Sequence, residues 1–183
     1  MRISVSFLFL FFTLLTSTQD KAPLVGGTAL VHNAVCDCTI SIPNGWILDS
    51  SRTITDAPPI MLYMSKGTTK WHAIITVEAA NKAVEGKNTL TNLLTWFSKV
   101  DSGSSNTITG VPNTTKDKKA VTVTSWIRPR QWLSHGCVGY VDEETHVAVI
   151  TLMAQNKQDL ETYLPTFAQV VESYSPVKSG VNK

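Results

Sequence analysis

The sequence predicts a single α+β domain in which helices pack on a mainly antiparallel β-sheet. Apolar and β-branched runs follow one another with few helices between them, which favours antiparallel pairing over alternating βαβ units. Two segments, 90–100 and 160–174, instead repeat their apolar residues at helical spacing. The length of 183 residues is ordinary for one domain and allows a sizeable core without disulfide or metal staples.

Composition and charge point away from some classes of partner. Hydrophobic residues make up 43% and charged residues 16%, which are globular values. The formal net charge is +2 and no block of Lys and Arg stands out. We therefore expect no nucleic-acid partner and no anionic membrane surface.

The N-terminus has the layout of a secretory signal peptide over residues 1–18. Arg2 supplies the positive end, residues 3–15 are apolar, and residues 16–18 are small or polar. An apolar run of 13 residues is too short for a spanning helix, which needs about 20. We expect a secreted or periplasmic protein with no membrane span after cleavage.

The first part of the chain predicts a lead-in and then a strand. Residues 19–34 contain Gly26-Gly27 without a clear period and predict a loose lead-in, with a short strand at 29–31 as an option. The domain should occupy 35–175. Within 35–49 apolar and polar residues alternate as in a half-buried strand, and Pro43-Asn44-Gly45 should interrupt it.

The middle of the chain predicts a hairpin and a helix. Residues 60–65 and 72–79 are apolar or β-branched, and Lys66-Gly67 lies in the short connection between them. Helical spacing then begins at Leu90, with Asn88 or Thr89 as the cap.

Three more strands and a closing helix follow. Residues 121–127 alternate, 132–141 form the next strand, and 146–154 are so apolar that both faces should be covered. The acidic residues between the last two strands predict a hairpin turn, with a cation site as the second option. Asn156 should cap the last helix, which Pro165 should kink or divide, and 176–183 should be a flexible tail.

Two sequence marks resemble the PsbP-like fold, and the resemblance covers roughly residues 39–174. Ile42-Pro43-Asn44-Gly45-Trp46 is similar to the opening strand of that family, which ends in Pro-x-Gly-Trp. The closing Phe167-x-x-Val170-Val171-x-Ser173-Tyr174 is similar to its final helix. The family includes the extrinsic photosystem II protein, a Ran-binding import factor and DcrB-like envelope proteins. The resemblance implies the fold and a non-enzymatic binding or accessory role, and the secretory signal argues against binding Ran.

The three cysteines leave three alternatives open. In an oxidising compartment, Cys137 can form a disulfide with Cys36 or Cys38, whereas a Cys36–Cys38 bridge would close a very small, strained loop. Alternatively, the thiols are free. A third option is that Cys36, Cys38, His135 and Cys137 converge on zinc or copper(I), if their two strands are neighbours.

Catalytic motifs are absent, since the chain has no G-x-S-x-G elbow, H-E-x-x-H or phosphate-binding loop. The candidate surface is instead aromatic and basic. Trp132, Arg128, Arg130 and Trp71 could contact a ligand or protein partner, because Trp and Arg are favoured at interfaces. Trp46, Trp96 and Trp126 should fill the core.

The sequence thus favours a secreted or periplasmic non-catalytic binding or accessory protein with a protein partner. The alternatives are an envelope metal or thiol-redox protein that uses Cys36, Cys38, His135 and Cys137, and a secreted hydrolase with an unrecognised site.

Overall fold

The part of the chain that the structure describes folds into one antiparallel sheet with two helices. The computed structural model describes residues 24–32, 35–49, 60–64, 72–83, 89–100, 108, 110–128 and 131–177. The elements are β1 (Leu24–His32), β2 (Asp37–Asp49), β3 (Ile60–Met64), β4 (Ala73–Asn81), α1 (Leu90–Val100), β5 (Val121–Ile127), β6 (His135–Asp142), β7 (His146–Ala154), α2 (Lys157–Ser173) and β8 (Ser175–Pro176). The predicted fold class, a single α+β domain with a mainly antiparallel sheet, is confirmed.

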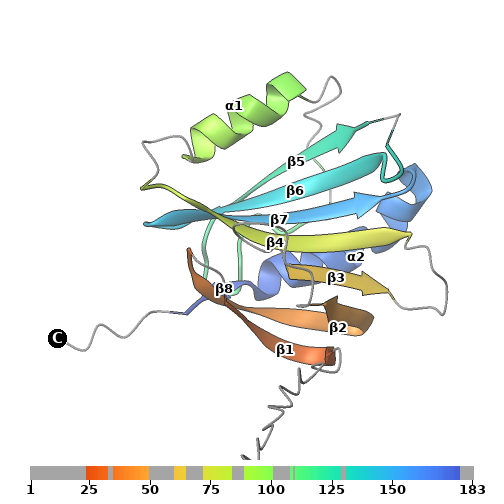
Figure 1. Cartoon of the computed structure of the whole chain (residues 1–183), viewed down its shortest axis with the longest axis horizontal. Helices are drawn as coiled ribbons and strands as arrows, with labels where there is room; N and C mark the ends of the chain where they lie inside the picture. Colours follow the sequence, from red (N-terminus) through yellow and green to blue (C-terminus); the bar gives the residue numbers. More distant parts are fainter. Residues whose placement is uncertain are drawn as a thin grey trace, which may run out of the picture.

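The strand order of the sheet is β1-β2-β3-β4-β7-β6-β5, with β8 paired to β2 (Figure 1). Every pairing is antiparallel, and β3 and β4 are neighbours, as the hairpin prediction required. The apolar run of β7 lies between β4 and β6, so its prediction as a central strand is confirmed. Its position gives it backbone partners on both sides, which suits a strand with both faces covered.

The two faces of the sheet carry separate apolar cores. On one face α2 buries Phe167, Val170 and Val171 against the inward residues of the strands. On the other, Leu90, Leu93 and Leu94 of α1 pack on a smaller cluster around Trp126 and Tyr140. Figure 1 shows α2 crossing behind the strands, well apart from α1. The sheet is therefore apolar on both faces over its central strands.

β2 does not stop at Pro43-Asn44-Gly45, so the predicted interruption is wrong. The strand runs for 13 residues, and Gly45 takes a φ of 81° that other residues rarely adopt. The register with β1 shifts at this point, between Val25 and Gly27. The residues before the shift pair with β8 and those after it with β3, so one long strand serves two neighbours.

The ends of the domain extend beyond the predicted boundaries. Within the expected lead-in, β1 pairs with β2 along its length and buries Ala29 and Val31. At the other end, Pro176 pairs with Cys38, and the Val177 amide donates to the Asp37 carbonyl at 2.8 Å. Part of the predicted tail therefore belongs to the sheet. The predicted signal peptide lies outside the described residues.

Side-chain burial follows the prediction for two of the three core tryptophans. Trp46 and Trp126 are buried, but Trp96 is 55% exposed, so its prediction as a core residue is wrong. α1 directs Leu93 and Leu94 to the sheet, and this orientation leaves Trp96 outside the packed face.

In α2 the helix continues through Pro165 as one element, and Asn156 caps it by accepting from the Asp159 amide at 2.9 Å. In the described part of the chain, no helix is long and apolar enough to span a membrane.

Candidate functional site

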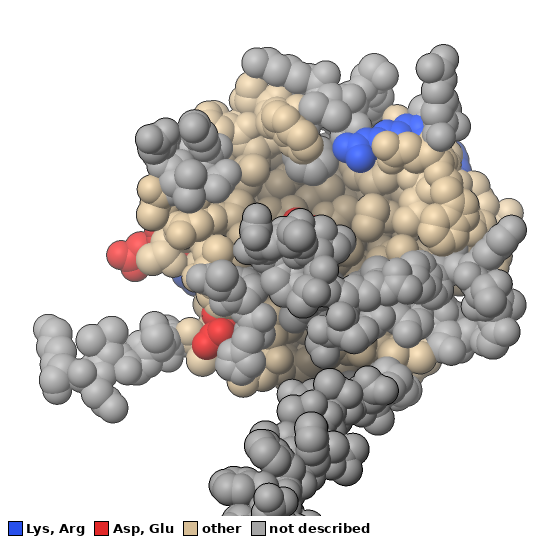
Figure 2. Space-filling view, viewed as in Figure 1, with Lys and Arg blue, Asp and Glu red and all other residues tan. Residues whose placement is uncertain are grey.

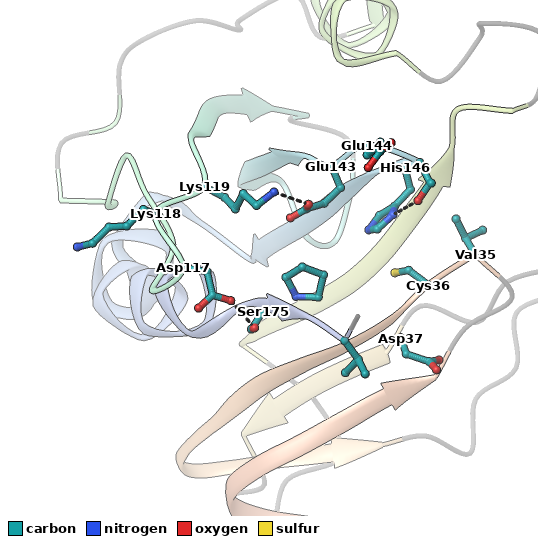
Figure 3. A pocket seen from close by; sticks show the side chains of 13 residues that line it. Val35, Cys36, Asp37, Asp117, Lys118, Lys119, Glu143, Glu144, His146 and Ser175 are labelled. Carbon is teal, nitrogen blue, oxygen red and sulfur yellow. Dashed lines mark hydrogen bonds and ion pairs between the residues drawn. The ribbon is translucent and has the colours of Figure 1, made fainter. Parts of the chain in front are cut away.

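A cavity of about 1000 Å³ lies where the start of β2, the loop before β5, the β6–β7 turn and β8 meet. Four short segments line it: 35–37, 117–119, 143–146 and 175–177. We call it the Cys36 cavity. Figure 3 shows Cys36 and Asp37 on one side and Glu143, Glu144 and His146 on the other. Residues that are distant in sequence thus share one hollow.

The charged residues of the Cys36 cavity are mainly acidic. Four carboxylates line it, and they belong to Asp37, Asp117, Glu143 and Glu144. Two ammonium groups, from Lys118 and Lys119, oppose them. Because the carboxylates outnumber the cations, the lining favours a positively charged guest.

Glu143 is the unusual carboxylate of this group, because its side chain is only 8% exposed. Its Oε2 accepts from the Lys119 Nζ at 3.0 Å, and this contact raises the pKa of Lys119. Its Oε1 is buried and has no hydrogen-bond partner among the described residues. A buried acceptor without a donor is costly, so this atom marks a place where a ligand or water donor would be favourable.

The backbone around Glu143 is held by the β6–β7 turn and by Lys82. The Glu143 amide donates to the His146 carbonyl at 3.0 Å. The Lys82 Nζ lies 2.6 Å from the Asp142 Oδ1 and also donates to the Glu143 carbonyl. Asp142-Glu143-Glu144 is the predicted hairpin turn, but it also buries one carboxylate. Sequence reasoning missed this burial because the lysines that approach Glu143 come from other segments.

Two thiols stand next to each other at the start of β2. Cys36 is half-buried in the cavity wall, and Cys38 is 1% exposed behind it. Their side chains form a hydrogen bond, which together with burial raises the pKa of Cys38. No disulfide is present at either residue. The structure therefore brings together a more accessible thiol and a buried thiol that keeps its proton.

A buried tyrosine and a buried histidine lie beside the thiols. The Tyr174 hydroxyl and the His146 Nε2 are 3.1 Å apart, and the His146 Nδ1 lies 3.1 Å from the Thr145 hydroxyl. Burial, and then the neighbouring Cys38, Cys36 and Glu143, raise the pKa of Tyr174. The phenol therefore stays neutral next to the thiols. Tyr174 was not singled out for a site in the sequence, where it belonged to the apolar stripe of the helix, whereas His146 was one of the histidines considered for the hydrolase alternative.

The structure does not bring Cys137 and His135 to this cavity. Three strands separate β2 from β6, so four strand spacings amount to about 19 Å along the sheet, far beyond the roughly 7 Å limit for a disulfide. Cys137 is a buried thiol, and the His135 Nδ1 contacts the Ser134 hydroxyl at 2.9 Å. Accordingly, no bridge joins Cys137 to Cys36 or Cys38. Among the described residues, no group of three or more His, Cys, Asp or Glu side chains could hold a metal ion.

The predicted aromatic and basic surface is described only in part. Trp132 is 52% exposed, whereas the Arg128 guanidinium lies 4.6 Å from the centre of the Trp126 ring. Arg130 and Trp71 lie outside the described residues. Figure 2 shows that uncharged residues make up most of the described surface in the view of Figure 1. The role of Trp132 and Arg128 in binding a partner stays a prediction.

Comparison with known proteins adds no relative to this picture. No protein-family model matches the chain, and no curated protein matches it. The PsbP-like resemblance stays a prediction. Fold and site together define an α+β domain with an acidic cavity, the Cys36 thiol in the wall of that cavity and the Cys38 thiol buried behind it.

Proposed function

We propose that this protein is a non-catalytic binding or accessory protein of the secreted or periplasmic compartment. The Cys36 cavity would receive a ligand, or a segment of a partner protein, that carries a cationic hydrogen-bond donor. The observation that carries the proposal is the buried Oε1 of Glu143, which has no donor among the described residues and belongs to a cavity lining residue. A volume of about 1000 Å³ is also at the upper end of the range typical of ligand pockets.

Charge supports a cationic guest over an anionic one. The carboxylates of the lining outnumber its lysines, and Lys119 is already committed to Glu143. A guanidinium or ammonium group could donate to the remaining oxygen of Glu143 while Asp37 and Glu144 provide further attraction. An anion would meet these carboxylates and lose its hydration without compensation.

The location of the protein rests on the predicted signal peptide. Sequencing the N-terminus of the protein recovered from the secreted or periplasmic fraction tests it directly. We expect a mature chain that starts near Gln19. A full-length chain that begins at Met1 and stays in the cytosol would contradict this part of the proposal.

Binding is tested by calorimetric titration of the folded protein with an arginine-containing tripeptide and with its glutamate-containing counterpart. We expect binding of the first only. Glu143→Gln keeps the size of the side chain but removes the charge, so affinity should fall about tenfold or more, as expected for a charge-assisted hydrogen bond. Glu161→Gln is the matched control, since Glu161 is exposed on α2 and pairs with Lys157 at 3.6 Å.

Two results would contradict the cavity assignment. One is equal binding of the basic and acidic tripeptides. The other is an equal affinity of the Glu143→Gln and Glu161→Gln variants for the basic tripeptide.

A further inference from the structure

Cys36 lines the cavity and Cys38 is buried behind it, and the two residues also differ in how their backbone is held. Cys38 is inside β2, between Val31 of β1 and Pro176 of β8. Cys36 precedes the first residue of β2 and is outside the sheet ladder. Only Cys36 would have to move for the two sulfurs to bond.

The spacing of the two residues permits a bond that is easily broken. Two residues of extended chain span about 6.6 Å, which is close to the upper limit of about 6.8 Å for the Cα atoms of a disulfide. A bridge here would be strained, and strained disulfides are the labile and exchanging ones. A side-chain hydrogen bond with Cys36 is also the main cause that raises the pKa of Cys38, which agrees with this proximity.

We propose that Cys36 and Cys38 form a thiol–disulfide exchange site that reacts with disulfides or dithiols of a peptide or protein entering the Cys36 cavity. Cys36 is the attacking thiol, because it lines the cavity. Cys38 is the resolving thiol, because it is buried behind Cys36 and its raised pKa keeps it protonated in the reduced protein. This activity goes beyond ligand binding and does not depend on Glu143.

The exchange needs only the two thiols of this chain and the disulfide of the partner. The Cys36 thiolate attacks one sulfur of the partner disulfide, a Cys36–partner disulfide forms, and the other partner sulfur leaves as a thiolate that takes up a proton. Cys38 then attacks the Cys36 sulfur, and its proton passes to the partner sulfur that leaves. The Cys36–Cys38 disulfide forms and the second partner sulfur leaves as a thiol. The protein loses two electrons and the partner disulfide gains them, and the reverse reaction oxidises a dithiol.

Cys137 provides an internal control, because it is a fully buried thiol on β6 with no second cysteine near it. Trypsin cuts after Lys21 and Arg52 with no Lys or Arg between them, so Cys36 and Cys38 share one peptide that excludes Cys137. Mass spectrometry therefore reads the oxidation of the pair separately from that of Cys137.

The experiment equilibrates the folded full-length mature protein with glutathione buffers of increasing oxidised fraction, then blocks free thiols by alkylation. We expect the peptide that contains Cys36 and Cys38 to convert reversibly to an internal disulfide. Cys137 should stay reduced throughout and should react with the alkylating agent only after the protein is unfolded. Cys38→Ser should accumulate a glutathione adduct on Cys36, because the resolving step is removed. Cys36→Ser should form neither product, and as a half-buried position it should tolerate serine.

Three outcomes would overturn the proposal. The first is a pair that stays oxidised in every buffer, as expected of a structural disulfide. The second is a pair that never oxidises. The third is the absence of any glutathione adduct on Cys36 in the Cys38→Ser variant. If that variant does not fold, the Cys36→Ser variant decides instead, and an undiminished glutathione adduct on its peptide 22–52 would overturn the proposal.

Discussion

Gly136 lies in β6 directly opposite Trp126 of β5, and the Trp126 ring occupies the space where a side chain would be. A Cβ added at Gly136 would be 2.3 Å from the Trp126 Cζ2 and 2.7 Å from the Leu152 carbonyl oxygen. Carbon atoms in good contact are about 3.5–4.0 Å apart, so the ring would have to move by about 1 Å. The carbonyl belongs to the neighbouring strand and cannot move without disturbing the sheet.

Gly136→Ala should therefore destabilise the fold, and Gly139→Ala in the same strand is the matched control. At Gly139 the nearest atom would be the Val171 Cγ2 at 3.3 Å, which needs only a small adjustment. Both substitutions restrict the unfolded chain equally, which by itself stabilises a protein by about 0.4–1 kcal/mol. Overpacking at Gly136 costs about 1–3 kcal/mol or more, so its variant should be the less stable by about that amount.

Urea unfolding followed by circular dichroism measures the two free energies. In a Trp126→Leu background the ring atoms are gone, so adding Gly136→Ala should cost less than it does in the native sequence. Equal stability of the Gly136→Ala and Gly139→Ala variants would refute the packing argument. So would an unchanged cost in the Trp126→Leu background.

Two further predictions concern alkaline pH and the cap of α2. Burial raises the pKa of Cys137 to about 12, so the neutral thiol stabilises the fold fully below the unfolded value of about 8.5 and progressively less as pH rises toward 12. In reducing buffer, the free energy of unfolding of the native protein should fall between pH 8 and about 10.5 by about 2–3 kcal/mol more than that of Cys137→Ala. An equal fall in the two proteins would contradict this prediction. Asn156→Ala removes the acceptor of the Asp159 amide and should lower the free energy of unfolding by about 1 kcal/mol in the same urea assay. Asn156→Asp keeps an acceptor at this position and should retain most of that free energy.

Much of the fold follows from local patterns. The apolar run 146–154 predicts a central strand, and β7 is one. Its residues pack alternately into the core under α2 and into the cluster under α1, and a strand covered on both faces is apolar on both. Val170 and Val171 follow Phe167 by three and four residues, and this helical spacing likewise predicts the buried face of α2. Trp96 shows the limit of this reasoning, because the tilt of α1 against the sheet decides which side of the helix is covered.

The candidate site was less predictable. Cys36 and Cys38 are visible as a pair in the sequence. The third cysteine, Cys137, was expected to join one of them by a disulfide, with free thiols or a shared metal as the alternatives. The order of the strands decides otherwise, since three strands lie between β2 and β6. Glu143 carried no signal of burial, because an acidic triplet between two strands is typical of an exposed turn.

By itself the sequence determines most of the strands and helices, except for β1 and β8, and most of their apolar faces, because these depend on residues a few positions apart. Strand neighbours are a different matter. β4 pairs with β7 across a helix and two further strands, and β8 returns to β2 from the end of the domain. Such pairings arise from long-range backbone hydrogen bonds and core packing, which no local pattern encodes. They alone bring Cys36, Glu143 and His146 to one cavity and place Tyr174 in contact with His146 behind it.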